Sequence, residues 1–281
     1  MKPSVEILIP VRYAFNAIVL TVESILKRTR YDGPWSVTVC DNSLADNRFA
    51  CEPHERKTIN GDDGNRRLWL RVQASAGRIR YIENTAQGRL YGHGENLRVL
   101  CDQCTARYGF LLNSTSEVLR PDWIGAMVDL CRDPAHDLGV ARFRDGGNHF
   151  DKCWITPNYW PNIMLLDMRL YRQHFPGHKW ELRQVGAEMF ERPEVFYGMT
   201  PPRTPERTPP LVFCDTGWSL YEKLRFDNPE GLRMHELPAD YWRKYIVWRG
   251  GIDRNSHRPD HEHVQGVLAE TEVALERLRH E

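Results

Sequence analysis

The sequence predicts an α/β protein in which a mostly parallel sheet is flanked by helices. Short apolar runs alternate with amphipathic helical segments through the first half of the chain, which is the pattern of a parallel sheet covered on both faces. Several of those runs stop at an acidic or amide side chain, as strands do at a ligand-binding edge. Of the 281 residues, 41% are hydrophobic and 27% are charged, so the chain can bury the core that this fold needs.

The expected strands are short runs rich in β-branched and aromatic residues, bounded by Pro, Gly, Asn or an acid. Pro10 ends the first run, and Asp41 follows the second. In chain order the expected strands are 5–11, 35–40, 78–82, 110–112, 139–143, 163–166, 211–215 and 241–248.

Helices are expected where apolar side chains recur at helical spacing. In chain order these segments are 17–27, 95–107, 123–131, one beginning near 170, 216–225 and the amphipathic stretch 264–279. Asp215 or Thr216 is expected to cap the segment 216–225.

Two stretches fit neither pattern. Residues 47–76 are charged and rich in Gly and Asn, which indicates a surface insertion. Residues 196–210 carry five prolines, which exclude a helix and argue against a central strand, so this loop is expected to be a lid or a tether. We expect one continuous domain, with a first half at 1–140, a looser second half at 141–255 and a C-terminal helix in 256–281.

Charge and cysteine usage narrow the class of protein. Lys and Arg number 38, as do Asp and Glu, and this zero balance argues against a chain built mainly to coat nucleic acid. No apolar run approaches a membrane span and no signal peptide is evident, so a cytoplasmic protein is expected. Cys101 and Cys104 form the only Cys-x-x-Cys pair, and reduced, buried thiols are expected rather than a zinc site.

The most informative stretch runs from Tyr108 to Trp123. Its apolar residues 110–112 are typical of a buried strand, and the polar run 113–117, Asn-Ser-Thr-Ser-Glu, follows at once. Open α/β sheets bind ligands beyond the carboxyl ends of their strands. We therefore expect this strand end to be the centre of a binding site.

Four segments together resemble the GT-A glycosyltransferases of the family 2 type, which take a sugar from a nucleotide donor. They are 5–11 with 21–26, then 37–46, 84–96 and 110–123. The second half matches weakly, mainly at 214–218 and 248–254. The resemblance implies a GT-A (Rossmann-like) fold, with a nucleotide sugar, UDP-sugar favoured, bound in 1–140, and with acceptor binding and catalysis in 141–255.

A binding site for a nucleotide donor needs contacts to the base and to the diphosphate. Asp41 at a strand end can accept from a uracil or guanine N–H, although the same carboxylate can simply cap a turn. Arg12 can meet a phosphate or remain a solvated surface residue. The resemblance implies a donor-binding set of Pro10, Val11, Arg12, Asp41, Asn84, Gly88, Asn96, Asn113, Ser114 and Thr115.

Metal use is where the sequence departs from the family. The family's Asp-x-Asp or Asn-x-Asp, which binds Mg²⁺ or Mn²⁺, is replaced by Asn-Ser-Thr at 113–115. Three alternatives stay open: Arg249 and Arg254 neutralise the leaving diphosphate, Glu117 and His257 hold a metal, or the site is inactive. No organic cofactor other than the donor is expected.

For the catalytic base we favour Asp215, with Glu188 as second candidate; the alternative for Asp215 is the helix cap. Attack by an acceptor hydroxyl would invert the anomeric centre. Trp160 and Trp218 can stack on an acceptor or pack in the core. The acceptor stays open among a glycan, a protein, a small molecule and a modified DNA base. A catalytically silent GT-A domain that binds a nucleotide sugar or a protein is the alternative function.

Overall fold

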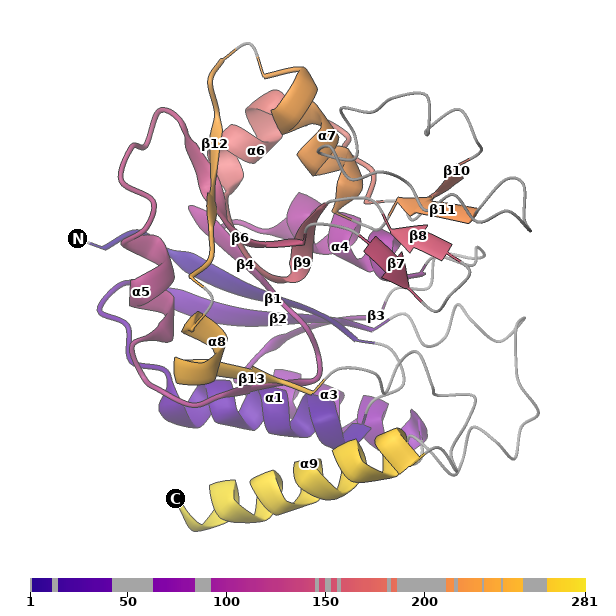
Figure 1. Ribbon diagram of the computed structural model, residues 1–281. Helices are drawn as coiled ribbons and strands as arrows, with labels where there is room; N and C mark the ends of the chain where they lie inside the picture. Colours follow the sequence, from indigo (N-terminus) through magenta and orange to yellow (C-terminus); the bar gives the residue numbers. More distant parts are fainter. Residues whose placement is uncertain are drawn as a thin grey trace.

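The computed structural model describes residues 2–11, 15–41, 63–83, 92–144, 147–149, 153–155, 158–180, 183–185, 211–214, 217–228, 230–238, 240–249 and 262–281. At its centre is a seven-stranded sheet with the order β12-β6-β9-β4-β1-β2-β3 (Figure 1). Its strands are β1 (Val5–Val11), β2 (Trp35–Asp41), β3 (Arg80–Glu83), β4 (Tyr108–Leu112), β6 (Asp137–Arg144), β9 (Asn158–Asp167) and β12 (Arg233–Glu236). The predicted α/β class is confirmed.

Strand direction divides this sheet into two parts. β4, β1, β2 and β3 run parallel to one another. β9 is antiparallel to both β4 and β6, while β12 is parallel to β6. The first half of the chain therefore supplies the parallel part, as the alternation of strands and helices predicts.

Helices cover both faces of the sheet (Figure 1). They are α1 (Phe15–Arg28), α3 (Asp63–Ser75), α4 (Gly92–Gln103), α5 (Trp123–Val128), α6 (Met168–His174), α7 (Trp218–Phe226), α8 (Tyr241–Lys244) and α9 (Glu262–His280). α1, α3, α5 and α8 contribute to one hydrophobic core, and α4, α6 and α7 contribute to the other. α9 packs against α1 through Ala274 and Leu278, which meet Leu20.

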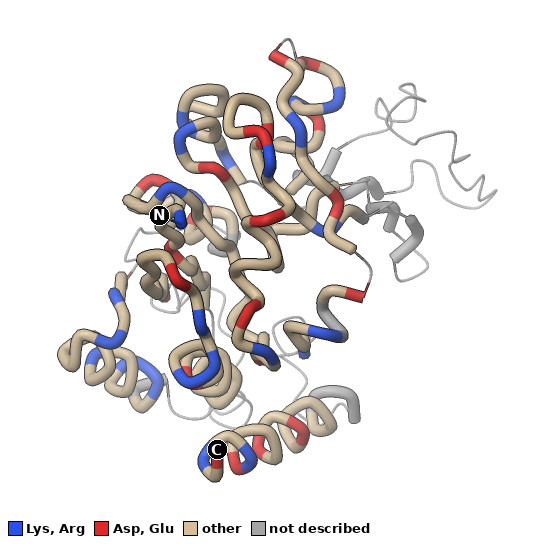
Figure 2. The backbone as a smooth tube through the Cα atoms, turned by 90° about the vertical axis from the view of Figure 1, so that its left-hand side faces the viewer, with Lys and Arg blue, Asp and Glu red and all other residues tan. Residues whose placement is uncertain are grey.

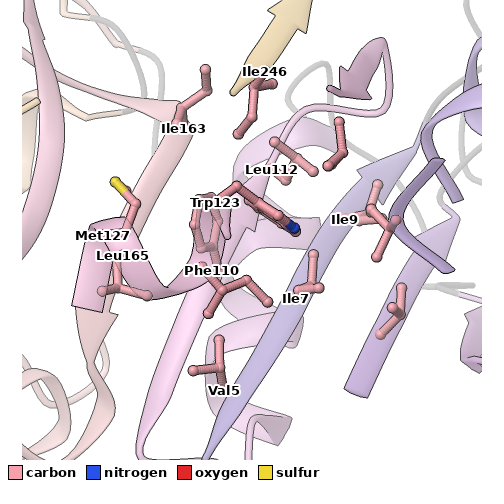
Figure 3. Packing of buried hydrophobic residues seen from close by; sticks show 14 of the residues in the cluster. Val5, Ile7, Ile9, Phe110, Leu112, Trp123, Met127, Ile163, Leu165 and Ile246 are labelled. Atoms are coloured by element: carbon pink, nitrogen blue, oxygen red, sulfur yellow. The ribbon is translucent and has the colours of Figure 1, made fainter. Parts of the chain in front are cut away.

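Alternation along the buried strands separates the two cores. Ile7 and Ile9 face the α1 core, whereas Leu8 faces the α4 core, as the period of two in a strand requires. Figure 3 shows the first of these cores, where Phe110 packs on Trp123 with ring centroids 4.7 Å apart. Parallel strands buried on both faces in this way read as continuous apolar runs, which is why they were visible in the sequence.

Two smaller sheets complete the described structure. One has the order β10-β11-β8-β7 and comprises β10 (Arg183–Val185), β11 (Leu211–Cys214), β8 (Cys153–Ile155) and β7 (Gly147–His149). The other pairs β5 (Ser116–Val118) antiparallel with β13 (Ile246–Trp248). This second pair brings the end of the chain beside the polar stretch that follows β4.

Several expected elements differ from those observed. Residues 63–75, the second part of the expected surface insertion, form helix α3, which buries Arg66 and Leu70. The expected strand 241–248 is the short helix α8 followed by β13. β5 and β12 were not expected, because their sequences are polar. Gly217 is the N-cap of α7, so neither Asp215 nor Thr216 takes that position.

The expectation of reduced, buried thiols is confirmed. Cys101 and Cys104 are buried free thiols, and burial raises the pKa of Cys104 to about 12. Within the described residues, no helix is both long and apolar enough to cross a membrane. Basic and acidic residues are mixed along the described chain in the view of Figure 2, in keeping with the zero balance of charge.

Candidate active site at the carboxyl ends of the parallel strands

The strand order places a candidate site beside β1. The chain passes from β1 outward through β2 and β3, and then returns to the other side of β1 as β4. Such a reversal leaves a crevice at the carboxyl ends of the strands, which is where open α/β sheets bind ligands. Val11 and Asp41 are paired at the ends of β1 and β2. The stretch 113–117 continues from β4 at the same edge.

Asp41 is buried at this edge, where the described side chains of Arg66 and Tyr81 hold it. Arg66 Nε donates to Asp41 Oδ2 over 3.1 Å, and neither side chain is more than 1% exposed. The Tyr81 hydroxyl donates to the same oxygen over 3.4 Å. Burial, together with the charge of Asp41, raises the pKa of Tyr81, so this phenol stays a donor. Asp41 is therefore an oriented carboxylate at the strand end.

Arg66 belongs to the candidate site and was not predicted from the sequence. It lies in α3, within a stretch whose charge is typical of a solvated surface. One signal was available, because Arg66 lies four residues before the buried Leu70 and so shares its helix face.

Asn96 connects the ends of β1 and β2. Its Nδ2 donates to Cys40 O over 3.0 Å and lies 3.5 Å from Val11 O, and the residue is 1% exposed. Cys40 Sγ lies 3.4 Å from Asn96 Oδ1, and burial raises the pKa of this thiol to about 12. These contacts fix the strand ends, while contact of Asn96, Pro10 and Val11 with a donor stays a prediction.

The strand-end turn, residues 113–115, is closed by its own hydrogen bonds. Asn113 Oδ1 accepts from Thr115 N over 2.9 Å and from Thr115 Oγ1 over 2.7 Å, and Asn113 Nδ2 lies 3.3 Å from Asn162 Oδ1. Thr21 of α1 fixes the turn from the other side, since its Oγ1 lies 2.9 Å from Ser114 O and 2.6 Å from Ser116 O. The side-chain oxygens of Asn113 and Thr115 are thus engaged with each other.

Glu117 is surrounded by arginines from three distant segments, and we call these four residues the Glu117 cluster. Arg28 of α1 lies 3.0 Å from Glu117 Oε1, Arg277 of α9 lies 2.5 Å from the same oxygen, and Arg249 lies 2.8 Å from Oε2. The Glu117 side chain is fully buried. Three guanidinium groups against one carboxylate make these four residues net positive, and Glu281 offsets part of that charge through its ion pair with Arg28.

Arg249 follows β13 directly and reaches the turn through its backbone. Its N–H donates to Thr115 O over 2.9 Å, and its Nη2 donates to Glu117. Within the described part of the chain, its buried Nε and Nη1 have no hydrogen-bond partner. Buried donors of this kind are uncommon and call for a ligand or a water molecule.

The residues around the turn do not fit the divalent cation that the family resemblance implies. Hard cations bind clusters of carboxylate and carbonyl oxygens. Among the described residues, no three His, Cys, Asp or Glu side chains come together as a metal site. Glu117 is bound by three arginines, and Asn113 Oδ1 is bound by Thr115.

An aromatic pair lies between β9 and β13. Trp160 meets Trp248 edge to face with ring centroids 4.6 Å apart, and the Arg142 guanidinium lies 4.6 Å from the Trp160 ring centroid. Both indoles are partly exposed. Trp248 was not predicted as a site residue, because its segment was assigned to a packing strand. By contrast, Trp218 is 1% exposed and packs on Tyr221, which favours a core role.

Seven predicted site residues lie outside the described residues: Arg12, Asn84, Gly88, Glu188, Asp215, Arg254 and His257. The elements that flank Asp215 are described. β11 ends at Cys214, and α7 begins at Trp218. A Cβ on Gly217 would lie 1.6 Å from Tyr159 O, so α7 starts against the backbone of β9.

Comparison with known proteins gives distant likenesses. No protein-family model matches the chain. The uncharacterized protein y4gI of Sinorhizobium fredii (strain NBRC 101917 / NGR234) is 29% identical over 133 residues. That alignment spans 47% of this chain and 12% of the relative.

Several solved glycosyltransferase structures are similar in fold. The mannosyltransferase PcManGT from Pyrobaculum calidifontis, in complex with GDP-Man and Mn²⁺, is 14% identical with a TM-score of 0.43, over 99% of this chain and 75% of that one. S. aureus TarS 1–349 in complex with UDP is 10% identical with a TM-score of 0.36, over 60% of this chain and 48% of that one. The glycosyltransferase GlyE of Streptococcus pneumoniae TIGR4 is 11% identical with a TM-score of 0.42, over 86% of this chain and 46% of that one. Likenesses this distant carry no argument about chemistry, which rests on the residues.

Proposed function

We propose that this protein is a glycosyltransferase that moves a sugar from a nucleotide-diphosphate donor, UDP-sugar favoured, to an acceptor hydroxyl with inversion. The observation that carries the proposal is the position of Asp41, an oriented carboxylate at the end of β2 beside the strand-order reversal. A carboxylate there can accept the N–H of a uracil or guanine ring. The sequence resemblance to GT-A enzymes over the first half supports the same donor class.

The proposed reaction needs a base and an electrostatic partner for the leaving group. Asp215, or Glu188 in its place, removes the proton of the acceptor hydroxyl, whose oxygen attacks the anomeric carbon. The bond from that carbon to the diphosphate oxygen breaks on the opposite face, so the configuration inverts. Arg249 and Arg254 offset the charge of the departing diphosphate, which replaces the role of a metal. The described residues around the strand-end turn support this metal-free mechanism, because they offer no cluster of free carboxylates to a cation.

Trp160 is the acceptor contact that we propose, with Trp248 added beside it. Their partly exposed rings can stack on a sugar or another flat acceptor. The class of acceptor stays open among a glycan, a protein, a small molecule and a modified base.

A donor panel tests the proposal. Nucleotide sugars are screened by thermal shift, and donor turnover is then measured with Mn²⁺ and with EDTA. We expect a UDP-sugar to bind and to turn over equally well in EDTA. Asp41→Ala should abolish donor binding, whereas Asp215→Asn should preserve binding and remove turnover. Full turnover by Asp215→Asn would show that the base is another residue.

A catalytically silent nucleotide-sugar-binding domain is the second candidate. The engagement of Glu117 by three arginines favours it, because the nearest carboxylate is not available to a metal. Binding of a nucleotide sugar without turnover of any donor in the panel would select this alternative.

A further inference from the structure

We infer that Glu117 is a positioning residue that holds Arg249 at the strand-end turn as an anion-binding group, with helix α9 as part of its support. The inference rests on the proposed function in one respect: the anion is the diphosphate of the donor.

Glu117 restrains the Arg249 side chain through one of its carboxylate oxygens. One carboxylate oxygen, Oε2, accepts from Arg249 Nη2 over 2.8 Å, and the Arg249 side chain is 12% exposed. A guanidinium held at one end in this way has little rotational freedom. Its Nε and Nη1 are buried and have no hydrogen-bond partner within the described residues. Each of these two charged donors can make a charge-assisted hydrogen bond to an oxygen of an anion.

The other carboxylate oxygen of Glu117 is bound to the two helices α1 and α9. Glu117 Oε1 is held by Arg28, whose Nη1 also donates to Val118 O over 2.5 Å, and by Arg277. Contacts from α1 and α9 therefore fix the carboxylate independently of its contact with Arg249. Arg28 in turn bonds Glu281, and Lys27 Nζ donates to Leu278 O over 2.6 Å, so the last turns of α9 are bound to α1. The C-terminal helix thus reaches the strand-end turn through a chain of ion pairs.

Glu117 can influence anion binding through its charge or through the orientation that it gives to Arg249. By Coulomb's law, removing the negative charge of Glu117 makes the site more attractive to an anion. If Glu117 instead orients Arg249, removing its charge releases the guanidinium and weakens anion binding. The two roles predict opposite signs for the change in anion affinity on substituting Glu117.

Because Nε and Nη1 of Arg249 are buried, an anion can contact them only after the atoms that cover them move.

The test uses the full chain, EDTA-treated, with inorganic pyrophosphate and UDP as probes in isothermal titration calorimetry. Arg249→Gln is expected to remove pyrophosphate binding. Glu117→Gln is expected to weaken it by about tenfold, the order of loss when a charge-assisted hydrogen bond that orients a binding group is broken. Unchanged binding by Arg249→Gln, or equal or tighter binding by Glu117→Gln, would overturn the inference.

A milder pair of variants covers the case in which Glu117→Gln does not fold. Arg277 is 54% exposed and Arg279, on the same helix, is 72% exposed and pairs with Glu276. Arg277→Gln is expected to weaken pyrophosphate binding by about threefold and Arg279→Gln to leave it unchanged. Equal affinities for these two variants would count against the role of α9. Donor turnover is measured separately, so a failure of the transferase proposal leaves these binding outcomes readable.

Discussion

Arg66 and Asp41 form an ion pair of 3.1 Å between Nε and Oδ2, although 25 residues separate them in the chain. The pair joins α3 to the end of β2, and both side chains are buried. Arg66 therefore orients the carboxylate that we propose as the contact for the donor base. It also makes α3, in a stretch with the composition of a surface insertion, part of the candidate site.

Replacing Arg66 by Met should lower the free energy of unfolding by about 3–5 kcal/mol, because it removes a cationic partner from the buried Asp41 carboxylate. Chemical denaturation measures the loss. The double variant Arg66→Met with Asp41→Asn should be less unstable than Arg66→Met alone, since asparagine carries no charge that needs a cationic partner. Arg71→Gln is the control: Arg71 is 59% exposed and pairs with Glu83, so its loss should cost under about 1 kcal/mol. Equal losses for Arg66→Met and Arg71→Gln would contradict the interpretation.

Thr21→Val should destabilise the protein by about 1–3 kcal/mol, although the two side chains have nearly the same shape. Thr21 Oγ1 accepts from Ser116 N over 3.1 Å and lies within hydrogen-bond distance of Ser114 O and Ser116 O. Valine leaves these buried groups without their partner. Thr21→Ser keeps the hydroxyl and is the matched control. Hydrogen exchange at the amide of Ser116 should quicken in the valine variant alone, and unchanged exchange there would refute the role of Thr21.

The sequence was informative where the structure depends on neighbours in the chain. The run at 5–11 reads as a strand because a strand buried on both faces is apolar throughout. Asp41 reads as a strand end because it is a charged residue directly after the apolar run of β2. The strand-end turn at 113–115 was located because a polar run follows an apolar one directly.

The contacts that define the site depend on long-range folding and have no local pattern. Glu117 meets Arg28, Arg249 and Arg277, which are 89, 132 and 160 residues away. The segment 241–248 was misread because its aromatic residues suit both a strand and a buried helix. Asp240 before Tyr241 is a helix-start signal that could have separated α8 from β13.

Acid should destabilise the protein through His178. Burial, with a smaller contribution from the charge of Lys223, lowers the pKa of His178 to about 4, against about 6.5 in an unfolded chain. Between these two values the unfolded state binds more protons, so the free energy of unfolding falls as pH falls from about 6.5 to about 4. The difference in pKa corresponds to about 3 kcal/mol over that range.

The measurement is the free energy of unfolding at pH 7 and pH 4 for the wild type and for His178→Gln. The variant should lose about 3 kcal/mol less than the wild type between the two pH values, because glutamine does not titrate. His136→Gln, at an exposed position, serves as the control. The same pH dependence in His178→Gln and in wild type would assign the acid sensitivity to other groups.

Gly217→Ala should displace the start of α7 and impair turnover. A Cβ at this position would lie 1.6 Å from Tyr159 O and 2.7 Å from Tyr159 C, and backbone atoms of a buried strand cannot yield as a side chain can. We expect a loss of about 1–3 kcal/mol in the free energy of unfolding, the usual cost of overpacking. Gly266→Ala in α9 is the control, since no atom lies within 4 Å of its added Cβ, and it should stabilise the helix by up to about 1 kcal/mol.

Asp215, the proposed base, lies two residues before Gly217 in the sequence. Displacing α7 should therefore lower donor turnover in Gly217→Ala while donor binding at Asp41 persists. Full turnover together with the stability loss would separate the packing of α7 from the catalytic site.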